Sequence, residues 1–154
     1  MQERGSITSG IAKLDEFLGG GYPTKAVTVI HPLDAVSRER GQPYMIGKCA
    51  SPVILRQATL HEAAMTIWKK APELLVLDGL VEVTEKFPVF LRILNARPTT
   101  VLLFADHGLV SLKAVKYFCR VRIHLHDSGT GIVGRLIKNT VSEYQGYSFY
   151  LTES

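Results

Sequence analysis

Short apolar segments alternate along this chain with segments in which apolar residues recur every three or four positions. The first pattern is typical of strands buried on both faces of a parallel sheet, and the second is typical of helices that cover such a sheet. The alternation predicts an α/β fold with a mainly parallel central sheet and helices on both faces. Strands are predicted at 26–30, 44–46, 53–55, 74–77, 99–105 and 120–126, and helices at 6–17, 59–70, 86–96 and 109–118.

The C-terminal part of the chain has a different pattern. Residues 132–139 and 147–152 are predicted to pair as an antiparallel hairpin at the edge of the sheet. The chain has 154 residues, and no internal repeat, low-complexity segment or linker-like stretch divides it. A single domain over residues 1–154 is therefore expected.

Composition excludes several classes of protein. With 46% hydrophobic and 21% charged residues, the chain is globular and not disordered. It has no apolar run near the roughly 20 residues that span a bilayer, and its start lacks the apolar core of a secretory signal. We therefore expect a cytoplasmic protein with no membrane partner. Cys49 and Cys119 are far apart and form no CxxC pair, so neither a disulfide framework nor a zinc clip is indicated.

Three segments resemble a known family when they are taken in order. They are Ile7-Thr8-Ser9-Gly10-Ile11 with Leu14-Asp15 and Leu18-Gly19-Gly20-Gly21-Tyr22-Pro23, then the strand at 74–78, and then Gly134-Arg135-Leu136-Ile137-Lys138-Asn139 with Phe149. The first resembles the entry to the core ATPase domain of the RecA superfamily, in its archaeal RadA and KaiC-like branch. The others are similar to the family's Walker B strand and closing hairpin, with Thr140 where Arg is usual. The resemblance implies a RecA-like three-layer domain. Family members bind ATP between subunits, form rings or filaments, and often act on DNA.

The chain departs from this family directly after the first strand. There the family carries G-x-x-x-x-G-K-[ST], whose backbone N–H groups, Lys and hydroxyl hold the phosphates and magnesium. This chain has only eleven residues from Pro32 to Gln42 before the predicted strand at 44–46. A phosphate loop and its helix together need about twenty residues. We therefore predict that the loop and most of its helix are deleted, and that Asp34 and Glu39 place negative charge where phosphate would lie.

A second glycine-rich segment fails as a phosphate loop. Residues 41–49 place five residues between Gly41 and Gly47 instead of four, and Cys49 stands where a hydroxyl is required. No water-activating Glu follows the predicted second strand. We therefore expect a degenerate nucleotide site, no cofactor and no catalytic residue. On this interpretation Asp78 is a Walker B-like relic at an Asp-Gly turn that closes its strand.

Basic residues gather in the C-terminal third, within a chain of formal net charge +4. Single-stranded DNA is the ligand that the resemblance suggests for them, and an ordinary solvated face is the alternative. Aromatic residues at 144, 147, 149 and 150 lie nearby in the sequence, and only an exposed one could stack on a base. The candidate nucleic-acid-binding residues are Lys113, Lys116, Arg120, Arg122, Arg135 and Lys138.

Histidines form a weaker candidate site. His124 and His126 share one face of a predicted strand, and His107 follows Asp106 elsewhere. Histidines two apart on a strand can share a metal ion, but the sequence places no third ligand. We expect no metal, and interpret this face as solvated or partner-facing.

The sequence leaves three functions open. The first is a non-catalytic RecA/RadA-like paralogue, an interaction or regulatory module in DNA recombination and repair. Its partners would be a RecA/RadA-type ATPase, further copies of itself, or single-stranded DNA. The second is a divergent ATPase that uses Asp78 with a non-standard phosphate site at Lys48 or Arg38. The third is a structural subunit of a larger RecA-type assembly.

Overall fold

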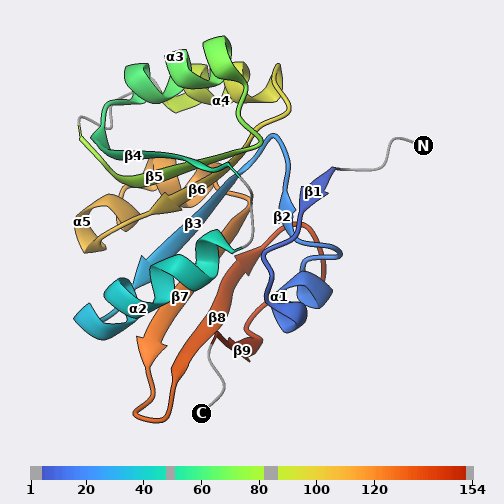
Figure 1. Cartoon of the computed structure of the whole chain (residues 1–154), viewed down its shortest axis with the longest axis vertical. Helices are drawn as coiled ribbons and strands as arrows, with labels where there is room; N and C mark the ends of the chain where they lie inside the picture. Colours follow the sequence, from blue (N-terminus) through green and yellow to red (C-terminus); the bar gives the residue numbers. More distant parts are fainter. Residues whose placement is uncertain (1–4, 48–50, 82–86, 152–154) are drawn as a thin grey trace.

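The structure is a computed structural model that describes residues 5–47, 51–81 and 87–151. Within these ranges seven strands form one sheet in the order β4-β5-β6-β3-β7-β8-β9 (Figure 1). They are β3 (Val27–Pro32), β4 (Val53–Ala58), β5 (Leu74–Leu80), β6 (Thr100–Phe104), β7 (Val121–Asp127), β8 (Ile132–Asn139) and β9 (Ser148–Tyr150). In this order, the first five strands, β4, β5, β6, β3 and β7, are parallel to their neighbours. Strand β8 pairs antiparallel with both β7 and β9. The mainly parallel sheet with a C-terminal antiparallel hairpin is therefore confirmed.

Helices pack on both faces of this sheet and make three layers (Figure 1). On β3, Val29 joins a core formed with the helices of one face, and Ile30 joins the core of the other face. The first face carries α3 (Leu60–Lys70), α4 (Phe87–Asn95), α5 (His107–Val110) and α6 (Lys113–Phe118). The second carries α1 (Ala12–Phe17) and α2 (Ala35–Ile46). Within the described ranges, no helix is long and apolar enough to cross a membrane.

Two predicted helices differ from the structure. The helix expected at 6–17 begins only at Ala12, because β1 (Ser6–Ile7) pairs with β2 (Tyr22–Pro23) in a small separate sheet. The helix expected at 109–118 is split into α5 and α6, and α5 begins earlier, where the carboxylate of Asp106 accepts the N–H of Leu109.

Other helix boundaries follow the sequence closely. At the start of α3, Thr59 and Glu62 form a reciprocal capping box. Lys86, the predicted start of the next helix, lies outside the described residues, as does Thr152, the predicted end of the last strand. Asp78-Gly79 does not close its strand as predicted: β5 continues to Leu80, which pairs with Ala58 of β4.

Gly134 of β8 allows the last strand to pack against the sheet. It pairs with Phe149 of β9, and a Cβ atom at this position would overlap the Phe149 ring. Phe149 is buried in the same core as Leu136 and Ile132. The absence of a side chain at position 134 therefore makes room for the aromatic residue that anchors β9.

We expect Gly134→Ala to lower the free energy of unfolding by about 1–3 kcal/mol, because the added methyl group displaces the Phe149 ring from a packed core. Gly108→Ala is the matched control, because a Cβ atom at position 108 would make only ordinary van der Waals contact. Urea unfolding of the three proteins measures the difference. Equal stability of the two variants would contradict this account.

Candidate functional site

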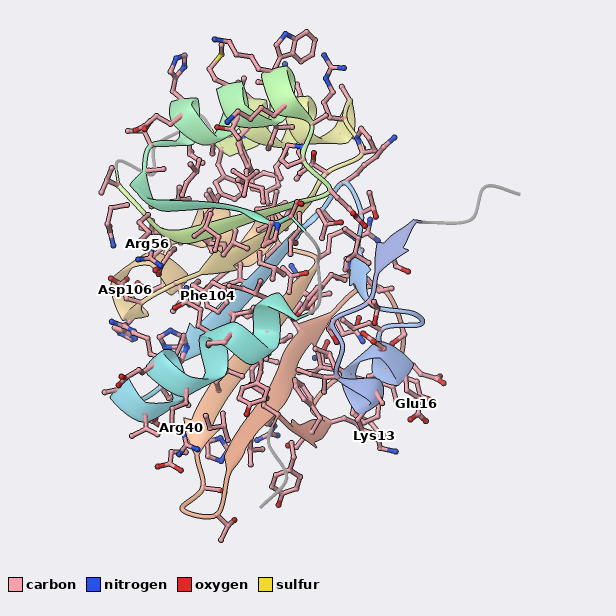
Figure 2. All side chains as sticks on the ribbon, in the orientation of Figure 1. Lys13, Glu16, Arg40, Arg56, Phe104 and Asp106 are labelled. Atoms are coloured by element: carbon pink, nitrogen blue, oxygen red, sulfur yellow. The ribbon has the colours of Figure 1, made fainter. Side chains whose placement is uncertain are left out.

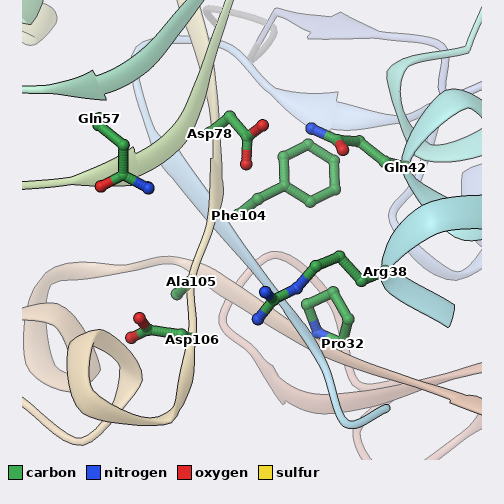
Figure 3. Close-up of a pocket in the computed structure, with 9 residues that line it drawn as sticks. Pro32, Arg38, Gln42, Gln57, Asp78, Phe104, Ala105 and Asp106 are labelled. Carbon is green, nitrogen blue, oxygen red and sulfur yellow. The ribbon is translucent and has the colours of Figure 1, made fainter. Parts of the chain in front are cut away.

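The carboxyl ends of β3, β5 and β6 meet at a small cavity of about 70 Å³ (Figure 3). In open α/β sheets, ligands bind outside the carboxyl ends of the strands, where successive connections pass to opposite faces. β3 and β6 meet this condition, because α2 follows β3 on one face and α5 follows β6 on the other. The cavity is lined by Pro32, Arg38, Gln42, Gln57, Asp78, Gly79, Phe104, Ala105 and Asp106.

The charges around this cavity are mixed. Arg38 extends from α2 toward the side of the cavity that holds Asp106, while Asp78 lies near Gln42 beside the Phe104 ring (Figure 3). One guanidinium therefore shares a small space with two carboxylates. Phosphate sites instead combine backbone N–H groups with an excess of positive charge.

Asp78 also has a cationic neighbour on the adjacent strand. It is half-buried and lies opposite Arg56 of β4, whose Nε is 3.8 Å from Asp78 Oδ2. Figure 2 places Arg56, Phe104 and Asp106 on the same side of the molecule, at the left of the view. The Arg56 side chain is 75% exposed, so this ion pair contributes little to stability.

The connection from β3 to α2 differs from the prediction. Residues 44–46 are predicted as a strand, but they form the end of the helix α2. The helix after the first strand, which the sequence predicts to be mostly deleted, is therefore present. Only Leu33 and Asp34 separate Pro32 at the end of β3 from the start of this helix. The strand thus passes almost directly into the helix.

Asp34 occupies the N-terminus of α2. Its Oδ1 accepts the backbone N–H of Ser37 at 2.7 Å, and its Oδ2 accepts that of Asp127, at the end of β7, at 2.9 Å. Partial burial opposes ionisation, but these hydrogen bonds and the nearby His126 lower the pKa of the Asp34 carboxyl below its ordinary value. A carboxylate of the chain itself thus lies where a helix N-terminus would otherwise attract an anion. Glu39, the other acidic residue singled out here, is exposed on α2.

The glycine-rich segment at 41–49 is not a loop over most of its length. Gly41 is buried inside α2 against Leu125 of β7, and Gly47 ends the helix. Lys48 and Cys49 lie outside the described residues.

The predicted nucleic-acid-binding residues lie on α6, at and in β7, and on β8. Lys113 and Lys116 are exposed on α6, and Arg120 precedes β7, where its Nε donates to the Thr140 hydroxyl. The other three lie on β7 and β8: Arg122 is directly opposite Lys138, and Arg135 is directly opposite His124. Lys138 Nζ donates to the backbone oxygens of Lys116 and Tyr117, which joins the end of α6 to β8. We call the six basic residues, Lys113, Lys116, Arg120, Arg122, Arg135 and Lys138, the basic face.

Histidines adjoin this basic face in an arrangement that the sequence did not reveal. His31 of β3 lies directly beside His124 of β7, with ring centroids 5.3 Å apart, and His107 of α5 lies 6.4 Å from His31. In the part of the chain that the structure describes, no group of three His, Cys, Asp or Glu residues is placed to hold a metal ion.

His124 is held in its neutral form. Partial burial and the nearby Arg122, His31 and Arg135 lower its pKa from 6.5 to about 4. At neutral pH its ring can therefore accept a hydrogen bond, and Arg122 Nη2 lies 3.3 Å from its Nε2.

Solved structures share this fold over nearly the whole chain. The crystal structure of the RadB recombinase covers 94% of this chain and 94% of its own length, at 13% identity and a TM-score of 0.68. A KaiC-like protein from the hyperthermophilic archaeon Pyrococcus horikoshii covers 96% of this chain and 94% of its own, at 14% identity and a TM-score of 0.69. The chain has a RecA-like fold. No family model matches the sequence, and no curated protein matches it.

Sequence reasoning missed part of what this RecA-like fold brings together. A signal for the helix start was present, because Asp is one of the preferred residues at the N-terminal cap of a helix. No sequence signal pairs His31 with His124, since only the parallel register of β3 and β7 places them side by side.

We expect Asp34→Ala to lower the free energy of unfolding at pH 7 by about 1–2 kcal/mol, because α2 loses its N-terminal cap. The pKa of Asp34 is lower in the folded than in the unfolded chain, so its contribution is present above about pH 4 and is lost as the pH falls through the folded value. Urea unfolding between pH 7 and pH 3 measures this. Glu39→Ala, on the same helix, is the control, and a difference between the native chain and Asp34→Ala that does not decrease as the pH falls below about 4 would overturn the account.

Proposed function

We propose that this chain is a RecA-like module that does not hydrolyse ATP and that binds single-stranded nucleic acid through its basic face, in recombination or repair. The observation that supports the absence of ATP hydrolysis, the first half of this proposal, is the short connection between β3 and α2, which consists of Leu33 and Asp34. A phosphate loop of the G-x-x-x-x-G-K-[ST] type needs more chain than this, and it needs free N–H groups at the helix start. Here Asp34 already accepts the N–H of Ser37.

The charge and the exposure of the basic face support the second half of the proposal, the binding of single-stranded nucleic acid. Lys113, Lys116 and Arg135 are exposed, and cations on neighbouring strands and on α6 can follow a phosphodiester backbone. Tyr150 of β9 is 60% exposed and pairs with Val133, two residues from Arg135 on β8, so it lies on the same side of the sheet. An exposed aromatic ring beside cations is the arrangement on which a base can stack.

The likeness to a RadB recombinase supports a role in recombination. By the same likeness, the protein partner would be a RecA/RadA-type ATPase or a second copy of this chain. Copurification with such an ATPase, without any affinity for nucleic acid, would instead favour a structural subunit.

A divergent ATPase is the second candidate, and one observation favours it. Arg38 and Asp78, which the sequence suggested as a non-standard phosphate and magnesium site, do line the same cavity. The second carboxylate there, Asp106, would oppose phosphate binding.

Thermal unfolding with magnesium and ATP separates these two functions. A nucleotide at 100 times its dissociation constant would stabilise the folded chain by about 2.7 kcal/mol. We expect no shift of the melting temperature by millimolar ATP. A clear shift that Asp78→Asn removes would show that nucleotide binds at Asp78, and release of inorganic phosphate from ATP by the native chain would then establish the ATPase candidate and overturn the first half of the proposal.

We expect Lys113→Ala/Lys116→Ala to weaken binding of a fluorescent oligothymidylate and to reduce the slope of log affinity against log salt by about 0.7 for each phosphate that the variant no longer neutralises. Lys69→Ala/Lys70→Ala is the matched control, because it removes two lysines from the end of α3. Fluorescence anisotropy across a salt series measures both. If both double variants weaken binding equally, net charge and not the basic face is responsible.

A further inference from the structure

The centre of the basic face holds two cations that lie directly opposite each other. Arg122 faces Lys138 across β7 and β8, and the neutral His124 faces Arg135 beside them. Like charges directly opposite on neighbouring strands are destabilising. Such an arrangement is stabilised when an anion lies among the cations.

Hydrogen bonding at this centre is incomplete. A guanidinium can only donate, so the contact between Arg122 Nη2 and His124 Nε2 requires a neutral imidazole with its lone pair on Nε2. Arg122 Nε is buried and has no hydrogen-bond partner among the described residues. A buried donor without a partner costs free energy, which an acceptor brought by a ligand would recover.

The groups around His124 are almost all cationic or neutral. His31 faces it from β3, with Nδ1 2.8 Å from the backbone oxygen of Ala105. Because that oxygen can only accept, His31 Nδ1 carries the proton. The titratable and charged groups that surround His124 are His31 on β3, Arg122 and His126 on β7, Arg135 and Lys138 on β8, and His107 with its neighbour Asp106 at α5. The Asp106 carboxylate is engaged at the start of α5, where it accepts the N–H of Leu109.

We propose that Arg122, His124 and Arg135 form a binding site for one phosphate of a single-stranded nucleic acid, and that His124 takes up a proton when the phosphate binds. This inference rests on the proposed function and adds a specific subsite and its regulation by pH. In the free chain, partial burial and the cations around His124 keep it neutral. A phosphodiester oxygen in contact with the ring offsets the repulsion by these cations and accepts a hydrogen bond from the protonated imidazole, which becomes a third cationic donor.

Proton uptake makes binding dependent on pH. The complex holds one more proton than the free chain, so affinity rises as the pH falls toward the free pKa of His124, about 4. If the bound pKa returns to about 6.5, His124 alone increases the affinity by about 30-fold between pH 8 and pH 5. The other histidines near the site also titrate, so the test compares variants and not absolute slopes.

The experiment measures oligothymidylate affinity by anisotropy at pH 8, 7, 6 and 5, at constant ionic strength. His124→Gln removes the titratable ring and keeps a polar side chain, and we expect it to lose about 30-fold of the gain between pH 8 and pH 5. His61→Gln on α3, where His61 is exposed, is the control and keeps the full gain. Identical pH profiles of the native chain and His124→Gln would overturn the proposal.

A direct measurement on the native chain covers the case in which His124→Gln does not fold. Imidazole resonances of His124, followed by NMR, give its pKa without ligand and with saturating oligothymidylate. We expect the pKa to rise on binding, and an unchanged value would overturn the proposal. The same rise with inorganic phosphate at an equal phosphate concentration would also overturn it, because the site would then bind a free anion.

The pattern of failure separates the two proposals. If the oligonucleotide binds at no pH, the proposed function is wrong, and the phosphate subsite falls with it. A second outcome is that the oligonucleotide binds, that Lys113→Ala/Lys116→Ala reduces the salt dependence of binding, and that His124→Gln leaves the pH profile unchanged. In that case the proposed function stands and only the phosphate subsite is wrong.

Discussion

The carboxylate of Asp34 joins the two parts of the fold on which the rest of this structure depends. One oxygen starts α2 and the other holds the end of β7, so the helix is tied to the sheet at its first turn. From there α2 runs across β7 and β8, with Gly41 against Leu125 and Met45 in the core. In P-loop proteins that position belongs to the ligand. In this chain a negative charge of the protein makes the contacts, and it needs no ligand to complete the helix start.

A second electrostatic feature lies on the other face of the same strands. The inward residues of β7, such as Ile123 and Leu125, form the core with α2, whereas the alternate residues Arg122 and His124 point to the opposite side. Asp34 supplies an anion of the chain itself at the end of β7, and the basic face is left with a surplus of cations. The proposed function uses this difference: one anion position is filled internally, and we propose that a phosphate of a partner fills the other.

Much of the fold could be predicted because local sequence and burial agree. The alternation over Val121, Ile123 and Leu125 indicates a strand with one buried face, and that face is buried in the structure. The segment from Ala35 to Ile46 could not be predicted in the same way, because Gly41 and Pro43 disfavour a helix and its apolar residues follow no clear stripe. Tertiary contacts stabilise this segment as a helix. One of them is the hydrogen bond that the Tyr22 hydroxyl donates to the backbone oxygen of Met45. The candidate basic residues could be identified from the sequence, but their pairing across β7 and β8 depends on register.

The length of the β3–α2 connection also limits how this fold can change over generations. Substitutions can exchange side chains, but they cannot lengthen a connection that consists of Leu33 and Asp34. A glycine-rich phosphate loop at this place would require an insertion together with removal of Asp34, and the insertion alone would separate the helix from the residue that starts it. Neither change is of use without the other. The non-hydrolytic role that we propose for this edge of the sheet therefore rests on a connection that single substitutions cannot change.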